Sequence, residues 1–220
     1  MSLAHLRGRF AIRASSFFRS LSFVIRHWWF PILMTHSSIP ATGVRRRPTS
    51  ADIRQAIRTV PDFPKPGIQF KDITTVLADA ALFAGSIDLL TGDFQPGSVD
   101  VVVGIDARGF IFAAGAALKL QAGFVPVRKK GKLPYQTHEQ SYDLEYGSNT
   151  IAIHTDAIKH GSRVILVDDL LATGGTAAAA VTLLQRLGAH ILEISFLIEL
   201  SFLNGREKLK GLPVRSIVTY

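Results

Sequence analysis

The chain has 220 residues, with 25 lysines and arginines, 17 aspartates and glutamates, and no cysteine. This length suits one domain of ordinary size with additional sequence, and the missing cysteines exclude a disulfide framework and a thiolate metal site. Residues 1–47 hold eight arginines and no acid, so the rest of the chain carries 17 basic and 17 acidic residues. Because that remainder is neutral, the net charge of +8 is no argument that the domain binds nucleic acid.

The first 47 residues form a basic extension with three open interpretations. Arginine, serine and aromatic residues without acids are typical of an organelle transit peptide. Alternatively, Met34 is the true start and the residues before it are upstream translation, or the extension binds a lipid or a partner. Its apolar stretch, Phe17–Met34, is a poor transmembrane helix because it is interrupted by Arg19, Arg26, His27 and Pro31. We expect a cytoplasmic protein that does not enter a membrane, with its domain at residues 48–220.

Residues 49–73 predict a helix followed by a turned, extended segment. Ser50 can cap a helix that places Ile53, Ile57 and Val60 on one face. Three prolines in Pro61–Gly67 end this helix, and Ile68–Ile73 alternates as a short strand.

A strand–helix–strand unit is predicted next, after a helix over Asp79–Leu90. It consists of a strand over Val99–Ile105, a polar turn at Asp106–Gly109, a helix over Phe110–Leu120 and a strand over Phe124–Val127. Its connection should be right-handed. Arg108 in the turn can hold an anionic oxygen, although a lone arginine at such a place more often forms a surface salt bridge.

Two polar segments follow the second strand of this unit. The first is a basic cluster, Arg128–Lys132, which on its own reads as a solvated charge run. The second, Tyr135–Gly147, has no clear hydrophobic period, and a loop of this length is often a lid. Thr150–His154 then reads as a strand.

The stretch Arg163–Thr182 combines a strand, two acids, a glycine turn and a helix start. Val164–Val167 is an apolar run that predicts a strand buried on both faces, and Asp168 and Asp169 follow it. Ala172–Thr176 has the glycines and hydroxyls that suit a phosphate at the start of the next helix, predicted over Ala177–Leu187. Since the acids would repel a bare phosphate, the ligand should also offer hydroxyls or Mg²⁺. A solvated acidic turn is the simpler alternative.

The last elements complete an α/β pattern. Ile191–Leu200 predicts a strand, Gly205–Leu209 a short helical turn, and Val214–Tyr220 a final strand. Alternating strands and helices imply a largely parallel sheet with helices on both faces. A ligand is expected across the carboxyl ends of the strands.

Five separated motifs resemble the type I phosphoribosyltransferase family, in the form found in adenine phosphoribosyltransferases, over residues ~50–220. VILVDDLLATGGT resembles the signature that binds phosphoribosyl diphosphate (PRPP), and DFPKPGIQFKDIT resembles the amino-terminal hood over adenine. DARGF, RKKGKLP and SYDLEYG resemble the diphosphate loop, the basic segment and the mobile catalytic loop. The resemblance implies the family fold with a small N-terminal hood, formation of AMP and diphosphate from adenine and PRPP, Mg²⁺ as cofactor, and a homodimer.

The same resemblance implies roles for individual residues. Asp168 and Asp169 hold the ribose hydroxyls and are candidate ligands of an Mg²⁺ held mainly by the substrate. The 5′-phosphate is bound by Ala172, Thr173, Gly174, Gly175 and Thr176, and the diphosphate by Arg108, Arg128, Lys129 and Lys132. Adenine is contacted by Gln69, Phe70, Lys71 and Leu170, although family members often carry arginine where Lys71 stands. Glu145 takes the purine proton, Tyr146 lies over the substrate, and the Asp106–Ala107 peptide bond is cis.

Two alternative functions stay open from the sequence. A guanine, hypoxanthine or xanthine phosphoribosyltransferase would keep the phosphate loop and change the base pocket, but the FPKPG hood and the DDLLATGGT motif favour adenine. A PRPP-sensing transcriptional regulator would need a folded DNA-binding domain, and residues 1–47 show no helix-turn-helix pattern. Glu199 resembles a position near the purine pocket, and an acid at the sheet edge is an equal alternative.

Overall fold

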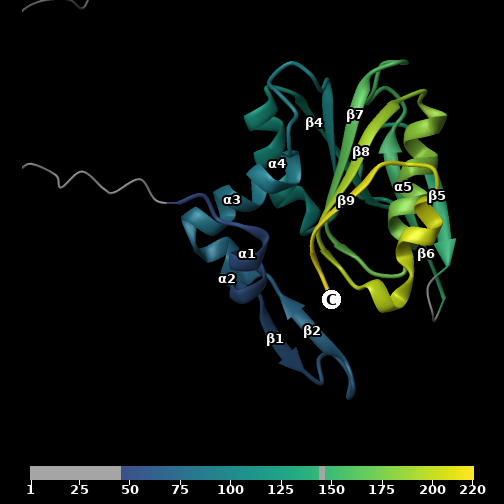
Figure 1. The fold of residues 1–220 in the computed structure, drawn as a ribbon. Coiled ribbons are helices and arrows are strands. Elements are labelled where there is room, and N and C mark those ends of the chain that lie inside the picture. Colours follow the sequence, from purple (N-terminus) through teal and green to yellow (C-terminus); the bar gives the residue numbers. More distant parts are fainter. Residues whose placement is uncertain (1–45, 144–146) are drawn as a thin grey trace, which may run out of the picture. The chain divides into compact units, whose positions relative to one another are not determined.

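The computed structural model describes residues 46–143 and 147–220 (Figure 1). Its central sheet consists of β3 (Val101–Ile105), β4 (Gly123–Lys129), β5 (Thr137–Asp143), β6 (Ser148–His154), β7 (Arg163–Leu171), β8 (His190–Glu199) and β9 (Val214–Thr219). The strand order is β5–β6–β4–β3–β7–β8–β9. Strands β4, β3, β7, β8 and β9 are parallel, whereas β6 is antiparallel to both β4 and β5. The predicted α/β class with a mostly parallel sheet is confirmed.

Helices cover both faces of the sheet, as the apolar strands require. Helices α3 (Ala80–Thr91) and α4 (Gly109–Leu120) lie on one face and α5 (Gly175–Arg186) on the other (Figure 1). Along β7, Val164 and Leu166 face the α5 side, while Ile165 and Val167 face the α4 side, the period of two expected of a strand.

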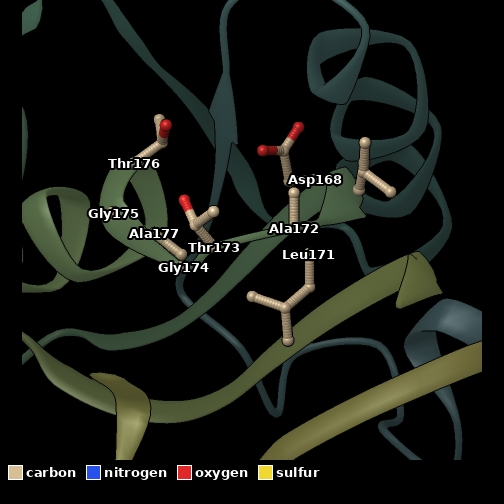
Figure 2. A pocket seen from close by; sticks show the side chains of 9 residues that line it. Asp168, Leu171, Ala172, Thr173, Gly174, Gly175, Thr176 and Ala177 are labelled. Carbon is tan, nitrogen blue, oxygen red and sulfur yellow. The ribbon is translucent and has the colours of Figure 1, made fainter. Parts of the chain in front are cut away.

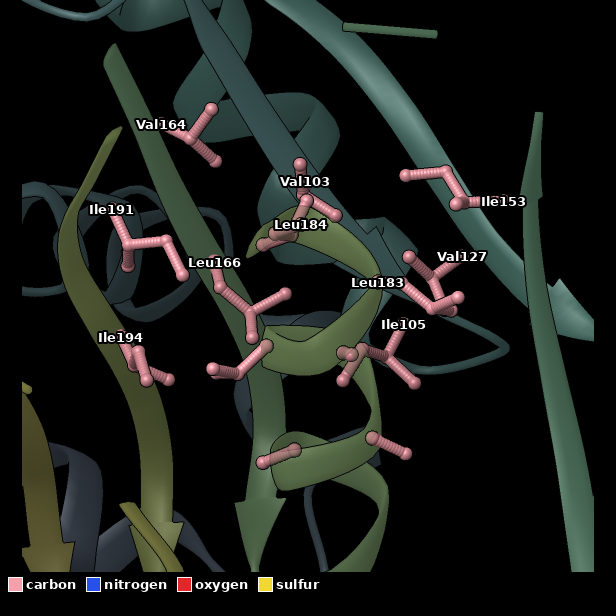
Figure 3. Packing of buried hydrophobic residues seen from close by; sticks show 14 of the residues in the cluster. Val103, Ile105, Val127, Ile153, Val164, Leu166, Leu183, Leu184, Ile191 and Ile194 are labelled. Atoms are coloured by element: carbon pink, nitrogen blue, oxygen red, sulfur yellow. The ribbon is translucent and has the colours of Figure 1, made fainter. Parts of the chain in front are cut away.

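The core under α5 is formed mainly by branched aliphatic side chains from five strands, β3, β4, β6, β7 and β8, and from the helix. In Figure 3, Leu184 of α5 lies near Val103 of β3, and Leu183 lies near Val127 of β4. Both leucines are fully buried, and burying one leucine side chain contributes about 1.5–3 kcal/mol. This packing holds α5 against the sheet.

The amino-terminal hood is a separate two-stranded antiparallel sheet, formed by β1 (Arg58–Pro61) and β2 (Gln69–Asp72) (Figure 1). It is flanked by α1 (Ser50–Ala56) and α2 (Thr74–Ala78). The predicted helix was too long, because Val60 lies in β1 and pairs with Phe70. The cap is Thr49 and not Ser50: the Thr49 hydroxyl accepts from the Asp52 amide, and the Asp52 carboxylate accepts from the Thr49 amide.

The predicted long loop over Tyr135–Gly147 is largely a strand. Thr137–Asp143 forms β5, which pairs with β6 along its whole length, from Thr137 opposite His154 to Asp143 opposite Ser148. β5 is polar because it is an edge strand of the sheet. Its residue Tyr142 packs against the core under α5. Residues 144–146, which include the predicted Glu145 and Tyr146, lie outside the described residues.

Two short 3₁₀ turns, η1 (Ser201–Leu203) and η2 (Gly205–Leu209), connect β8 to β9. Within residues 46–143 and 147–220, the longest helices are too short to cross a bilayer.

Candidate active site

The site lies where parallel strands β3 and β7 end side by side. Gly104 of β3 pairs with Val167 of β7. The Asp106–Gly109 turn and the residues after Leu171 therefore both lie at the carboxyl ends of the parallel strands. A Cβ atom at Gly109 would collide with the carboxylate of Asp168. Only glycine therefore lets α4 begin this close to β7.

Residues Ala172–Thr176, which the sequence predicts to bind phosphate and which are called the phosphate loop below, line a pocket at the start of α5. Asp168, Leu170, Leu171 and Ala177 complete its lining (Figure 2). Gly174 is the N-cap of α5 in the left-handed conformation, with φ +76°, and no side chain caps the helix. The first amides of α5 have no partner inside the helix, as in known phosphate sites. In Figure 2 the side chains of Thr173, Thr176 and Asp168 extend to the same side of this loop.

Asp168 and Asp169 are both buried in β7, with 8% and 7% of their surface exposed. Burial raises the pKa of Asp168 well above its usual value, and the charge of Asp169 adds to this rise. The pKa of Asp169 is also raised by burial, against the opposing effect of Arg108. The Arg108 Nε lies 2.6 Å from the Asp169 carboxylate. Arg108 is the cation that faces these two buried carboxyl groups, and it pairs with Asp169. The carboxyl groups can therefore still accept hydrogen bonds from hydroxyl groups or bind a metal ion.

The turn after β3 confirms one expectation in detail, since the Asp106–Ala107 peptide bond is cis. Arg128 of β4 is 3.2 Å from the Asp106 carboxylate and donates to the carbonyl of Lys132. Lys129 and Lys132 are exposed, and neither forms an ion pair with another described residue. They are thus the cations of this cluster left available for an anionic ligand.

Arg108 also connects the hood to the sheet. Its guanidinium lies 5.5 Å from the ring centroid of Phe70 in β2, and Phe70 packs edge-on against Phe63 at 5.1 Å. Gln69, predicted beside the base, is exposed. Leu170 lines the phosphate-loop pocket and is half-buried. The structure therefore brings Phe70, Arg108 and the buried acids together.

Lys71 is engaged elsewhere in this structure. Its ammonium donates to the Thr59 hydroxyl at 2.9 Å and lies 4.0 Å over the ring of Tyr220. The same ring is contacted by the Arg54 guanidinium at 4.6 Å. Lys71 thus links the hood to the segment after β9.

The comparisons with known proteins agree with this geometry. The family model described as the phosphoribosyl transferase domain matches residues 69–211. The adenine phosphoribosyltransferase of Acidothermus cellulolyticus is 59% identical over 162 residues, covering 74% of this chain and 92% of the relative. That of Maricaulis maris is 52% identical and covers 77% of this chain and 98% of the relative. The chain belongs to the adenine phosphoribosyltransferase family.

Solved structures of the family have the same fold. The crystal structure of the Rhodothermus marinus adenine phosphoribosyltransferase is 52% identical, with a TM-score of 0.74, and the match covers 78% of this chain and 98% of that one. The Saccharomyces cerevisiae enzyme, solved with adenine and an imino-altritol bisphosphate, is 43% identical with a TM-score of 0.72, covering 76% and 97%. The expected resemblance, fold and enzyme class are confirmed.

Sequence reasoning missed the ion pair between the buried Glu199 and the partly exposed Arg206, which flanks the phosphate loop. Glu199, at the end of β8, is 7% exposed and accepts from Arg206 and from the Ser216 hydroxyl. Its carboxylate is thus engaged within the protein, and it lies at a sheet position opposite Leu171. The Asn204–Gly205 dipeptide signals a turn in the sequence, but nothing local indicates what that turn contacts.

Proposed function

We propose that this chain transfers the 5-phosphoribosyl group of PRPP to adenine, giving AMP and diphosphate. The observation that carries the proposal is the phosphate loop beside two buried carboxyl groups, which Arg108 connects to the aromatic hood. The family assignment supports the same reaction, since the relatives in this family are named adenine phosphoribosyltransferases.

In this proposal the phosphate loop and the acids hold the ribose phosphate. The amides at the start of α5, with the hydroxyls of Thr173 and Thr176, bind the 5′-phosphate, and Ala172, Gly174 and Gly175 let the ligand approach the backbone. Asp168 and Asp169 accept hydrogen bonds from the ribose hydroxyls. The raised pKa of both groups reflects a site that a donor or a cation would stabilise.

The reaction replaces the bond between C1′ and a diphosphate oxygen with a bond between C1′ and a purine nitrogen, which loses its proton. Positive charge develops on the ribose ring, and negative charge develops on the departing diphosphate. Arg108, Arg128, Lys129 and Lys132 stabilise that departing group. Glu145 is our proposed acceptor of the purine proton, and Tyr146 is proposed to lie over the substrate.

The described residues fit an Mg²⁺ ion that arrives with the substrate. Asp168 and Asp169 are adjacent buried oxygen donors, but no group of three or more potential ligands occurs within residues 46–143 and 147–220. Mg²⁺ characteristically takes one or two carboxylates and completes its shell with water and substrate oxygens. When bound, Mg²⁺ would neutralise charge on the diphosphate.

The hood supplies the proposed adenine site. Phe70 is half-buried and offers one ring face for stacking. Backbone groups near Gln69, with Lys71, would read the edge of the base, and Leu170 would contact it from β7. For Lys71 to reach the base, its ammonium must leave Thr59, so its contribution is testable by substitution.

We further propose a cytoplasmic homodimer that acts without nucleic acid or membrane. Ile111 and Leu118 of α4, with Phe124 of β4, are large apolar side chains exposed by 39–83%, and such surfaces commonly form subunit contacts. Sedimentation equilibrium measures the mass, and a monomer at micromolar concentration would contradict the dimer. Residues 1–47 are proposed as a targeting segment, or alternatively Met34 is the true start and residues 1–33 are upstream translation. A chain beginning at Met34 should keep its kcat/KM within about tenfold, or about 1.4 kcal/mol.

Release of diphosphate from PRPP is the direct test of the function. The purified chain with Mg²⁺ should release diphosphate with adenine and not with guanine, hypoxanthine or xanthine. Equal turnover with another purine would reassign the base pocket. Binding of PRPP with no turnover of any base would instead favour the sensor alternative.

A further inference from the structure

The backbone of Gly205 is packed directly against the phosphate loop. A Cβ atom at Gly174 would collide with the carbonyl group of Gly205, and a Cβ at Gly205 would collide with the carbonyl of Ala172. Gly205 is itself buried. The turn that begins η2 therefore forms the wall behind the loop, and a shift of this turn would move Gly174.

Arg206, the next residue, ties this turn to the sheet. Its Nε lies 3.0 Å from one oxygen of Glu199, and its NH2 group donates to the other, a bidentate contact. The NH1 group donates to the carbonyl of Val214, also at 3.0 Å. The Ser216 hydroxyl donates to the same carboxylate at 2.6 Å. One guanidinium thus joins η2 to the end of β8 and the start of β9.

The contact between Arg206 and Glu199 differs from an ordinary surface ion pair because the Glu199 carboxylate is buried and the arginine contacts both of its oxygens. Only 9% of the Glu199 side chain is exposed, and hydrogen bonds from Arg206 lower its pKa. Asn204, just before the turn, has φ +52°, and this left-handed residue turns the chain so that Gly205 faces the loop while Arg206 points back to Glu199. Leu209 anchors the other end of η2 in the core beneath α5.

We propose that Arg206 and Glu199 are positioning residues for PRPP, acting through Gly205 to hold the phosphate loop in its binding conformation. This inference rests on the proposed function, because it concerns the loop proposed to bind the 5′-phosphate. Neither side chain lines the phosphate-loop pocket, so their effect passes through the backbone. A loop held in its bound shape does not need to be ordered when the ligand arrives, and this strengthens binding.

The chain contains a matched control at the opposite end of β8. Arg215 contacts Glu193 in the same bidentate way, at 2.7 and 3.0 Å, and the Ser195 hydroxyl donates to Glu193. This second pair joins β8 to β9 but has no contact with the phosphate loop. Replacing either arginine by methionine keeps an aliphatic side chain and removes the guanidinium group that makes the bidentate contact.

The test compares Arg206→Met with Arg215→Met in the full chain. Calorimetry measures the Kd for PRPP with Mg²⁺ and the Kd for AMP, and thermal unfolding measures the stability of each variant. We expect Arg206→Met to weaken both ligands by about 10-fold to 10²-fold, since the loss of one hydrogen bond between a loop amide and a charged phosphate has an effect of this size. Arg215→Met should stay within about twofold for both ligands even if it loses similar thermal stability.

Kinetics separate positioning from general destabilisation. In Arg206→Met the KM for PRPP should rise while the KM for adenine and the kcat at saturating PRPP stay within about threefold. Arg206→Lys keeps the charge and one contact to Glu199 and should fall between the parent and Arg206→Met. If Arg206→Met does not fold, Arg206→Lys carries the test, with a Kd for PRPP raised by at least about threefold.

A folded Arg206 variant that binds PRPP as tightly as the parent overturns the inference, as does an equal loss in Arg215→Met. A parent that binds PRPP but does not use adenine overturns the proposed base and leaves the positioning role standing. A parent that binds neither PRPP nor AMP overturns both.

Discussion

Gly174 allows the sharpest test of the phosphate loop. Its φ of +76° is in the left-handed region, and its α-carbon faces the backbone of Gly205. Gly174→Ala should cost about 1–2 kcal/mol of the free energy of unfolding for the left-handed conformation alone. The added Cβ must also displace backbone atoms, which cannot move as a flexible side chain does.

The effect on the ligand should exceed the effect on folding. Moving the loop away from Gly205 shifts the first amides of α5, and each hydrogen bond from an amide to a charged phosphate contributes about 1.5–3 kcal/mol, or about 10-fold to 10²-fold in affinity. The affinity of Gly174→Ala for PRPP and for AMP should fall by that order. Calorimetry at a temperature well below the unfolding midpoint measures this loss on folded protein.

Gly97→Ala is the control for the backbone conformation. Gly97 has φ +80°, nearly the same as Gly174, but no atom lies within 4 Å of the position of an added Cβ. Gly97→Ala should therefore lose about 1–2 kcal/mol of stability and keep the parent affinity for PRPP. Unchanged PRPP affinity in folded Gly174→Ala, or an equal loss in Gly97→Ala, would refute the assignment of the loop.

Three further predictions concern chemistry, the hood and acid stability. Glu145→Gln should lower kcat by about 10²–10⁴-fold with little change in PRPP affinity, and a near-native rate of AMP formation in a single turnover would remove Glu145 from the reaction. Tyr220→Leu removes the ring beneath Lys71, an interaction of about 0.5–1 kcal/mol that Lys71 must give up to reach the base, so the KM for adenine should fall by about two- to fivefold while that for PRPP does not change, and Tyr220→Phe should behave like the parent. Hydrogen bonds from Arg163 lower the pKa of Asp100 from 3.8 to about 2. The pKa of Asp100 is lower in the folded state than in the unfolded state. Its contribution to stability is therefore present above pH 3.8 and is lost as the pH falls towards 2. Chemical unfolding at intermediate acid pH should show this loss in the parent and not in Asp100→Asn.

The sequence by itself determined the parallel core and the phosphate loop. Val164–Val167 is long enough for a strand and too short for a helix, and its branched side chains suit burial on both faces. The glycines of the loop and the acids before it are consecutive in the chain, so their chemistry can be read locally. The motifs at Arg108 and Phe70 could be assigned only through the family resemblance.

Tertiary structure alone decided the contacts between distant segments. Thr137–Asp143 looks like a loop because an edge strand keeps polar residues on its open side, and only its pairing with β6 makes it a strand. The pairing of Arg108 with Asp169 joins the turn after β3 to a residue near the end of β7. Gly205 reaches the phosphate loop because β7 and β8 are neighbours in the sheet, and a hydrophobic period carries no information about which turns become neighbours.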